Sequence, residues 1–268
     1  MSPPRARHRP PELPLQRTRT AQAPTATAPP RHHAGMNLSR ETSLRIRNAL
    51  DNGLPAAVRD SRLVMMPLMR LALGRHARDF AEFKERAFDL SREEFADFYR
   101  RIEGSEVHGP TDLNAACAEA IVDVVHGRTV LEVGCGRGWL ASRMAQVAEH
   151  VTASDIIVSQ ATAGIAGVDF TAADAEALPW PDRSFDVVVS THTLEHVQDL
   201  RAALGELRRV ARERVVVVVP KERPFRYTFN PHLHFFPYPW SWRAVAGVVP
   251  GSRLEDLGDW FYMEPVPA

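Results

Sequence analysis

Five valines stand in a row at Val215–Val219, and this run limits the fold more than any other feature of the sequence. Continuous β-branched residues are typical of a strand that is buried on both faces, as in a parallel sheet covered by helices. Four further apolar runs precede it, at 129–133, 151–154, 168–172 and 185–190. Helical patterns alternate with these runs, at 139–149 and 200–212. The alternation predicts an α/β fold with a doubly wound, mostly parallel sheet.

The chain before this sheet divides into two parts of different composition. Residues 1–35 hold eight prolines and almost no large apolar side chains, which predicts a disordered Pro/Arg-rich tail. One hypothesis is that translation starts at Met36 and that this tail is not made. Residues 36–110 have helical periodicity and predict an N-terminal helical extension, and residues 111–268 would form the main domain.

Local signals in the helical extension predict where its helices begin. Ser91 and Glu94 form a capping box ahead of an apolar run, and Thr111 is expected to cap a helix that ends at Val125. A helix at 39–50 is also expected. The methionine-rich stripe at 62–73 is interpreted as a buried helix face, with a substrate pocket or a lipid contact as the alternatives.

The charges of the tail and of the remaining chain cancel. Residues 1–35 hold six arginines and one glutamate, for +5, and the other residues hold 27 basic and 32 acidic side chains, for −5. An acidic main body disfavours nucleic acid as a partner. No run of about 18 apolar residues is present, so no stable membrane insertion is expected. Cys117 and Cys135 are too few for a disulfide framework, which favours a cytoplasmic location.

A glycine cluster follows the first predicted strand, at Gly134, Gly136 and Gly138. Glycines at a strand-to-helix turn permit positive φ angles and a close approach of the backbone to a ligand, and the following helix N-terminus favours an anion. A dinucleotide fingerprint would need glycine where Trp139 stands, and the lysine of a phosphate-binding P-loop is absent. A tight turn without any ligand is the alternative interpretation.

Two acids end the next two strands. Asp155 follows the second strand and could accept hydrogen bonds from both hydroxyls of a ribose, although it could also cap a helix. Asp174 follows the third strand and could accept from an exocyclic amine, while the backbone N–H of Ala175 donates to a ring nitrogen. The carboxyl ends of parallel strands meet at one edge, so these groups would face one crevice.

These motifs resemble the class I S-adenosylmethionine-dependent methyltransferases, in particular the small-molecule group typified by ubiquinone and menaquinone biosynthesis methyltransferases. The resemblance covers roughly residues 111–222. Four segments carry it: Val130–Gly138, Thr152–Ile156, Asp174–Pro179 with Ser184–Asp186, and Leu194–Val197 with Asp199. It implies a Rossmann-like methyltransferase fold and S-adenosyl-L-methionine as cofactor.

The resemblance also implies a role for each matching residue. Gly134, Cys135 and Gly136 would wrap the methionine end of the cofactor, and Gly138 would also belong to the cofactor-binding turn. Glu132 would orient the amino group of the cofactor, directly or through water. Asp155 would hold the ribose, Ile156 would lie against the adenine, and Asp174 and Ala175 would read its edge. Thr191 and His192, after the fourth strand, would lie beside the sulfonium.

Methyl transfer to an oxygen or nitrogen nucleophile also needs a proton acceptor, for which histidine is suited. The candidates are His192, His232 and His234, the last two within an aromatic-rich segment that could line a substrate pocket. These aromatics could instead pack the rim of the sheet. His196 is expected to be structural. The His-x-His pair could ligate a metal, but no neighbouring carboxylate supports this, so no metal site is predicted.

The two ends of the chain depart from the resembling family. Ser241–Val249 can supply a helix and Arg253–Met263 one strand, so the last strand is expected to be missing or very short. Such a six-stranded sheet has an exposed edge, which would allow a homodimer. The alternative is that 253–263 forms a bent pair of short strands. Residues 36–110 are expected to act as a lid over the active site.

The sequence therefore predicts a methyltransferase that acts on an O, N or C nucleophile of a small molecule, such as a secondary metabolite, quinone or sugar. Two alternatives stay open. One is a non-catalytic methyltransferase-fold protein that binds or regulates, and the other is a protein methyltransferase.

Overall fold

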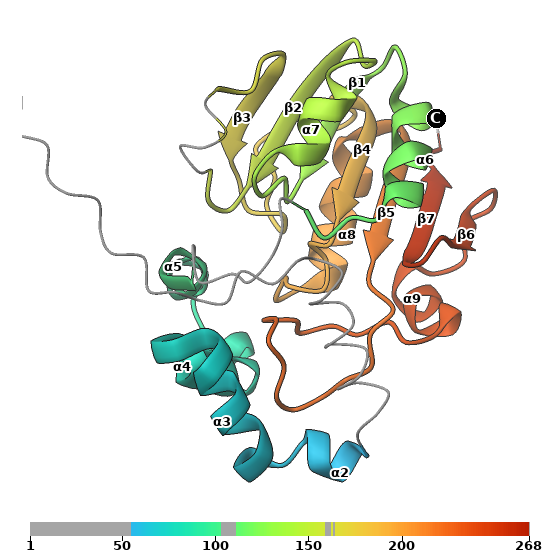
Figure 1. Cartoon of the computed structure of the whole chain (residues 1–268). Helices are drawn as coiled ribbons and strands as arrows, with labels where there is room; N and C mark the ends of the chain where they lie inside the picture. The colour runs from blue at the N-terminus through green and yellow to red at the C-terminus, as the bar shows by residue number, and fades with distance from the viewer. Residues whose placement is uncertain (1–54, 103–110, 159–161, 163, 268) are drawn as a thin grey trace, which may run out of the picture. The chain divides into compact units, whose positions relative to one another are not determined.

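The computed structural model describes residues 55–102, 111–158, 162 and 164–267, all of which belong to one compact unit. A seven-stranded sheet forms its centre, in the order β3-β2-β1-β4-β5-β7-β6 (Figure 1). The strands are β1 (Thr129–Val133), β2 (His150–Asp155), β3 (Val168–Ala172), β4 (Phe185–Thr191), β5 (Ala211–Val219), β6 (Arg253–Asp256) and β7 (Trp260–Pro265). The first five are parallel, and β7 runs antiparallel to both β5 and β6. The predicted doubly wound, mostly parallel sheet is confirmed.

The end of the chain differs from the expected single last strand. Arg253–Met263 does not form one strand, because the chain reverses at Gly258, whose φ of 100° suits glycine. The N–H of Gly258 donates to Asp256 at 3.1 Å, which closes the turn between β6 and β7. The expected six-stranded sheet is therefore wrong and the alternative of a bent pair is correct. The open edge beside β5, which led to the expectation of a homodimer, is filled by β7.

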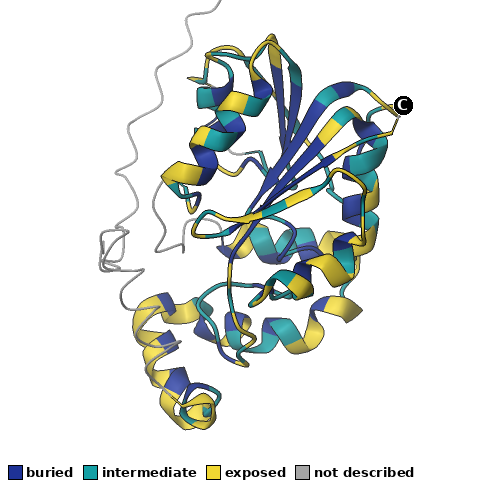
Figure 2. Ribbon diagram, turned by 90° about the vertical axis from the view of Figure 1, so that its right-hand side faces the viewer, coloured by how far each residue is buried: buried dark blue, intermediate teal, exposed yellow. Residues whose placement is uncertain are grey.

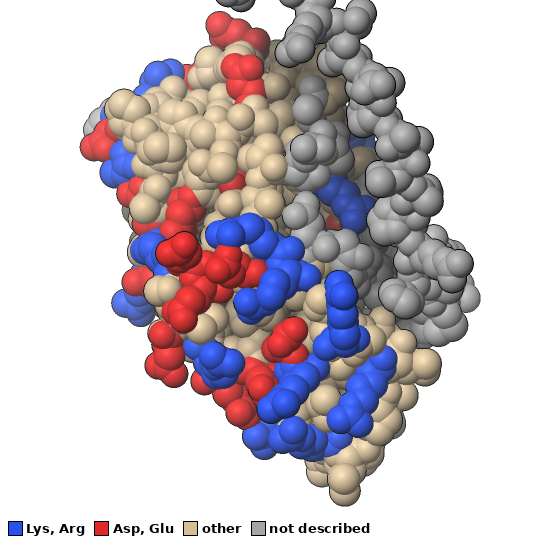
Figure 3. All heavy atoms as spheres, turned by 90° about the vertical axis from the view of Figure 1, so that its left-hand side faces the viewer, with Lys and Arg blue, Asp and Glu red and all other residues tan. Residues whose placement is uncertain are grey.

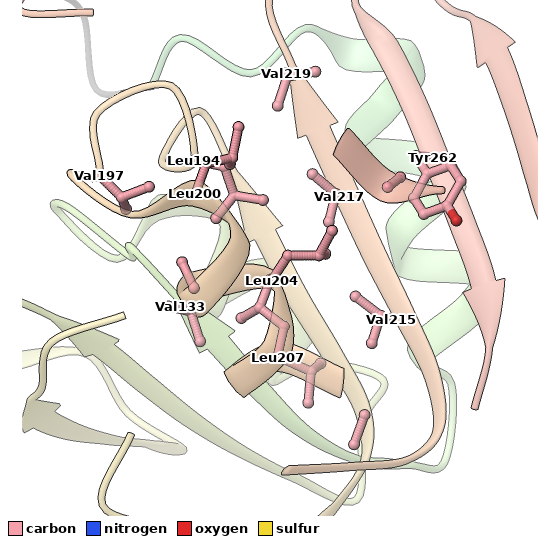
Figure 4. Close-up of a cluster of buried hydrophobic side chains, with 14 of the residues drawn as sticks. Val133, Leu194, Val197, Leu200, Leu204, Leu207, Val215, Val217, Val219 and Tyr262 are labelled. Atoms are coloured by element: carbon pink, nitrogen blue, oxygen red, sulfur yellow. The ribbon is translucent and has the colours of Figure 1, made fainter. Parts of the chain in front are cut away.

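The valine run fills both faces of the sheet. Val215, Val217 and Val219 lie in one buried cluster, and Val216 and Val218 lie in another on the opposite face. Successive side chains of a strand point to opposite faces, so an uninterrupted apolar run serves a sheet that is covered twice. Figure 4 shows the first cluster, in which Leu204 and Leu207 lie beside Val217 and Val215.

Four helices cover this sheet. They are α6 (Ala115–Val125) and α7 (Trp139–Met144) on one face, and α8 (Leu200–Val210) and α9 (Pro239–Ala246) on the other. Their ends differ from the expected ones. Asn114 caps α6 through a bond from the Cys117 N–H at 2.9 Å, whereas Thr111 only accepts from Leu113. The chain enters β5 directly at Ala211, so α8 ends earlier than 212.

The N-terminal helices form a core of their own, which we call the cap. It comprises α2 (Ala56–Arg59), α3 (Arg62–Leu73), α4 (Ala77–Arg86) and α5 (Arg92–Ile102), with 3-10 turns at Gly74–His76 and Ala87–Asp89. Met65 and Met69 are fully buried in it, which confirms a buried face for the methionine-rich helix. The predicted capping box is present, since the Ser91 N–H donates to the Glu94 carboxylate at 2.9 Å and the Glu94 N–H donates to the Ser91 hydroxyl oxygen at 3.3 Å. The tail 1–35, the start at Met36 and the helix at 39–50 lie outside the described residues.

Burial is greatest in the strands at the centre of the sheet (Figure 2). The outer side of α3 is exposed, with Leu63 at 89% and Leu71 at 77%. No helix of the described residues is both long and apolar enough to cross a bilayer.

Candidate functional site

The candidate site lies where the strand order reverses, at the carboxyl ends of β1 and its neighbours β2 and β4. In open α/β sheets, ligands bind at this switch point. The chain leaves β1 in a turn whose first two N–H groups, from Gly134 and Cys135, donate to the Ser154 carbonyl at 2.7 and 2.9 Å. These bonds tie the glycine turn to the end of β2.

Gly134 is required at its position on two grounds. Its φ is +80°, and a β-carbon there would lie 1.9 Å from the hydroxyl oxygen of Thr193. Thr193 is itself fixed by bonds from its hydroxyl to the carbonyls of Val133 and Thr191. Gly136 and Gly138 also have positive φ, and Gly138 is the N-cap of α7. The turn thus brings backbone and the helix N-terminus to the carboxyl edge of the sheet.

Asp155 lies at the end of β2 beside this turn. One of its oxygens accepts from the Gly136 N–H at 2.8 Å, and the other accepts from the Ile157 N–H at 3.3 Å. The side chain of Ile156 is partly buried and packs against the cap core. The structure therefore brings the predicted acid into direct contact with the predicted glycine turn.

Glu132, on β1, is 2% exposed and its Oε2 has no hydrogen-bond partner among the described residues. Burial raises its pKa well above the usual range, and the nearby Asp155 raises it further. A buried polar atom without a partner is costly unless a ligand satisfies it. Glu132 is thus suited to accept a hydrogen bond from a bound group.

Asp174 follows β3 and is engaged by the cap. The guanidinium of Arg92, at the start of α5, donates to one of its oxygens, and the Glu176 N–H donates to the other at 2.9 Å. Arg92 also lies 3.3 Å from a carboxylate oxygen of Glu176. Ala175 is partly buried against the sheet core. Both oxygens of the predicted adenine-reading acid are therefore already bonded, which the sequence did not indicate.

His192 follows Thr191 at the end of β4 in a left-handed conformation, with φ of 51°. This conformation is uncommon outside glycine and often marks a functional segment. Its ring lies between two carboxylates. The Nδ1 atom is 3.5 Å from Oε1 of Glu195, and the Nε2 atom is 3.5 Å from Oδ2 of Asp259. Burial alone would lower the pKa of His192, but these two carboxylates raise it to about 10. The imidazole holds a proton at neutral pH, which does not favour a general base.

His232 and His234 come from one segment but have different surroundings. The Nδ1 of His232 lies 2.6 Å from Glu222, and the ring is 5% exposed. The Nε2 of His234 donates to the Val197 carbonyl at 2.9 Å, and burial lowers its pKa. A backbone contact of this kind favours a structural role for His234. His232 has instead the carboxylate partner that catalytic and metal-bound imidazoles often have.

His196 lies against His232, with ring centroids 4.6 Å apart. Its Nδ1 is 3.2 Å from the hydroxyl of Tyr99, on α5. Burial and the neighbouring His232 lower its pKa to about 4, so the ring is neutral at physiological pH. The cap, the β4 end and the segment after β5 therefore meet at this pair of histidines.

Four residues of the site were not predicted from the sequence: Arg92, Tyr99, Glu195 and Glu222. Glu195 and His196 stand in the Leu194–Val197 motif, so that motif could have drawn attention to Glu195. No pattern in the sequence places Glu222 beside His232 or the cap residues beside the sheet. Cys135 is buried, and burial raises its pKa, which agrees with a small turn residue rather than a reactive thiol.

Comparison with known proteins agrees with this geometry. Residues 131–219 match the family model described as "Methyltransferase domain". This segment runs from β1 to β5 and is similar to methyltransferase domains. The chain is also 39% identical to a protein of Mycolicibacterium smegmatis named a probable S-adenosylmethionine-dependent methyltransferase, across 39% of this chain and 41% of the relative.

Two further relatives of the chain have names that give different acceptors. The malonyl-[acyl-carrier protein] O-methyltransferase of Erwinia billingiae is 36% identical over 37% of this chain and 41% of its own length. The ajmaline N-methyltransferase of Rauvolfia serpentina is 30% identical over 34% of this chain and 35% of its own length. The chain thus spans about two fifths of the length of the curated relatives it matches. A solved methyltransferase from Aquifex aeolicus is 20% identical, with a TM-score of 0.45, over 55% of this chain and 87% of that structure.

Proposed function

We propose that the protein is an S-adenosylmethionine-dependent methyltransferase. The observation that carries this proposal is the convergence of the glycine turn, Asp155 and Asp174 at the carboxyl edge of β1 to β3, within the segment that matches the methyltransferase domain. The named relatives of that segment are methyltransferases, which supports the same cofactor. The narrower likeness to ubiquinone and menaquinone enzymes remains a prediction.

In this proposal the cofactor binds along the carboxyl edge of the sheet, in one orientation. Gly134, Cys135, Gly136 and Gly138 surround the methionine end, and Glu132 accepts from the amino group. Asp155 binds the ribose hydroxyls, and Ile156 lies against the adenine. Asp174 and Ala175 read the adenine edge, and Thr191 lies beside the sulfonium.

The sulfonium carries its own activation, so the protein mainly has to align the acceptor and exclude water. The acceptor attacks the methyl carbon as the bond from that carbon to sulfur breaks, and the proton of an O–H or N–H acceptor must leave. Of the three histidines predicted for this role, His192 is already protonated and His234 bonds a carbonyl. His232 is therefore the candidate that we retain for contact with the acceptor.

The cap is proposed to act as a lid, with the boundaries 36–110 and 111–268 predicted from the sequence. Its contacts with the domain support this role. Arg92 reaches Asp174, Tyr99 reaches His196, and the Gln198 amide donates to the carbonyls of Ala87 and Leu90. A lid of this kind would exclude water from the transfer.

We propose a small molecule as acceptor, as for the ajmaline enzyme by its name. On the face seen in Figure 3, Lys and Arg lie beside Asp and Glu. Exposed ion pairs such as Arg78–Glu82 and Arg226–Glu85 also join opposite charges. Mixed charge of this kind differs from the basic surface of a nucleic-acid binder. A protein acceptor and a non-catalytic binding role are the alternatives to this proposal, and a cytoplasmic location and a homodimer stay predictions.

Cofactor binding tests the proposal directly. Calorimetry of the full chain should show one site for S-adenosylmethionine and none for NAD. Asp155→Ala should weaken binding at least about tenfold, because it removes a charged hydrogen-bond partner. Asp169→Ala is the matched control, since Asp169 is an exposed acid on β3 that pairs with His150.

Each result bears on the proposal. Unchanged binding in Asp169→Ala, with weak binding in Asp155→Ala, supports the assignment. Absence of S-adenosylmethionine binding in the wild-type chain, or equal binding by both variants, contradicts it. Transfer of labelled methyl to phenol, quinone or sugar acceptors then separates an enzyme from a binding protein.

A further inference from the structure

Three side chains from two distant segments meet beneath the cap: Glu195 and His196, after β4, and His232, after β5. Each offers one ligand atom, and these atoms lie within 4.8 Å of one another. Three ligands about 2.1 Å from one ion lie roughly 3–3.5 Å apart, so small side-chain rotations would bring them to bonding distance.

The carboxylate of Glu195 is the second reason to consider a ligand here. Glu195 is fully buried, and neither of its oxygens has a hydrogen-bond partner among the described residues. Its cationic neighbour His192 lies 3.5 Å away, beyond a good hydrogen bond. The charge of His192 offsets part of the cost of burying this carboxylate, and coordination of a cation would satisfy its oxygens directly.

His232 is held as a metal-bound imidazole usually is, whereas His196 has contacts that a metal would have to replace. Glu222 lies 2.6 Å from Nδ1 of His232, which fixes the ring and leaves its other nitrogen to serve as a ligand. The Tyr99 hydroxyl orients His196 through Nδ1, and the Pro231 carbonyl also contacts this ring. Coordination by His196 would displace one of these two contacts.

We propose that Glu195, His196 and His232 form a binding site for a divalent transition-metal ion. Two imidazoles and one carboxylate suit zinc or iron(II) rather than magnesium, which prefers oxygen ligands. Three protein ligands leave coordination positions open for water or for an oxygen of another molecule. The proposal does not depend on methyl transfer.

The sequence did not favour a metal because the His-x-His pair had no acidic neighbour. In the folded chain, the two histidines of this pair do not belong to the same cluster of side chains. His234 turns away to the Val197 carbonyl, while the chain after β4 supplies Glu195 and His196 to His232.

Titration of the metal-free full chain with Zn²⁺ tests the site. We expect one ion per chain with a dissociation constant of about 1 µM or lower at neutral pH. Glu195→Gln, His196→Ala and His232→Ala should each weaken binding about 100-fold, and Glu222→Gln about tenfold. Circular dichroism of each variant shows whether the fold is kept. Glu195→Gln is close to isosteric, so it reports on ligation even if a histidine variant misfolds.

Two histidine variants serve as controls. His234→Ala removes the other histidine of the pair, and His150→Ala removes an exposed histidine that pairs with Asp169. Both should keep the wild-type affinity. The visible absorption of bound Co²⁺ should change in His232→Ala and stay the same in His150→Ala.

The proposal is overturned if the wild-type chain binds no Zn²⁺ or Co²⁺. It is also overturned if Glu195→Gln and His232→Ala bind as tightly as the wild type. An ion on His232 and the role in methyl transfer that is proposed above for this residue exclude each other, so the same titration also decides between them.

Discussion

Burial of the Glu132 carboxyl group lowers the stability of the folded chain, and the same residue belongs to the proposed cofactor site. It is buried, and its pKa is raised by burial and by Asp155. A carboxyl group with a raised pKa in the folded state binds its proton more tightly there than in the unfolded chain. Stability contributed by the neutral form is present at low pH and is lost as pH rises from the unfolded pKa, near 4.3, towards the folded pKa.

Glu132→Gln removes this pH dependence, because glutamine does not ionise. We expect the variant to be more stable than the wild type at pH 8, by roughly 1–3 kcal/mol, with a smaller difference at pH 5. Urea denaturation at both pH values measures it. The same variant should bind S-adenosylmethionine more weakly. A difference in stability that does not grow with pH would contradict the assigned cause.

Gly134 and Gly136 form a matched pair for a second prediction. Both have positive φ, but a β-carbon at Gly136 meets open space, whereas one at Gly134 meets Thr193 at 1.9 Å. Gly136→Ala should cost about 1 kcal/mol of the free energy of unfolding, the cost of the backbone conformation. Gly134→Ala should cost about 2 kcal/mol more, because Thr193 must also move.

Thermal or urea unfolding of the cofactor-free variants checks the difference. Equal losses in the two variants would show that backbone conformation alone sets the need for glycine in this turn. Stability is the readout because both glycines also belong to the proposed cofactor site.

At the residue scale, the sequence predicts the parts of the site that follow strands directly. Gly134, Asp155 and Asp174 were found because strand ends in a parallel sheet share an edge. Their partners were not found. The contact between Arg92 and Asp174 joins residues 82 positions apart, and the contact between Glu222 and His232 depends on the path of an irregular segment.

At the scale of elements, α5 controls access to Asp174. Arg92, at its first turn, occupies one oxygen of the acid that would read the adenine. Cofactor binding must therefore share or displace this contact. Arg92→Ala should strengthen S-adenosylmethionine binding about two- to fivefold, a modest gain because the arginine is half exposed.

Arg100→Ala is the matched control for Arg92→Ala. Arg100 lies on the same helix and pairs with Asp97 within it, so its loss should leave cofactor affinity unchanged. Calorimetry of the three proteins checks the prediction. If Arg92→Ala binds more weakly than the wild type, the arginine instead helps to hold the cap in the binding-competent position.

Strand positions were easier to predict than strand and helix ends. The valine runs in β4 and β5 have no competing helical interpretation, because their β-branched side chains lie on both faces. The ends depend on local hydrogen bonds that several residues could make. Thr111 and Asn114 are both good capping residues, and only the folded chain shows that Asn114 caps α6.

At the scale of the whole molecule, the C-terminal hairpin completes the sheet and connects it to two helices. Glu264, on β7, is 1% exposed and accepts from the Nε of Arg208 at 2.6 Å and from the Tyr262 hydroxyl at 2.6 Å. Arg208, on α8, also donates to the Ala246 carbonyl at the end of α9. One arginine thus joins three elements around a buried carboxylate.

Loss of this arginine should affect global stability. Arg208→Ala leaves Glu264 buried without its charged partner, and we expect a loss of about 2–4 kcal/mol in the free energy of unfolding. Arg201→Ala, an exposed change on the same helix, should alter it by less than about 0.5 kcal/mol. A double variant, Arg208→Met with Glu264→Leu, should recover most of the loss because it removes the uncompensated charge. Urea denaturation of the four proteins measures these differences. If the double variant is as unstable as Arg208→Ala, packing of the arginine rather than charge compensation holds the hairpin in place.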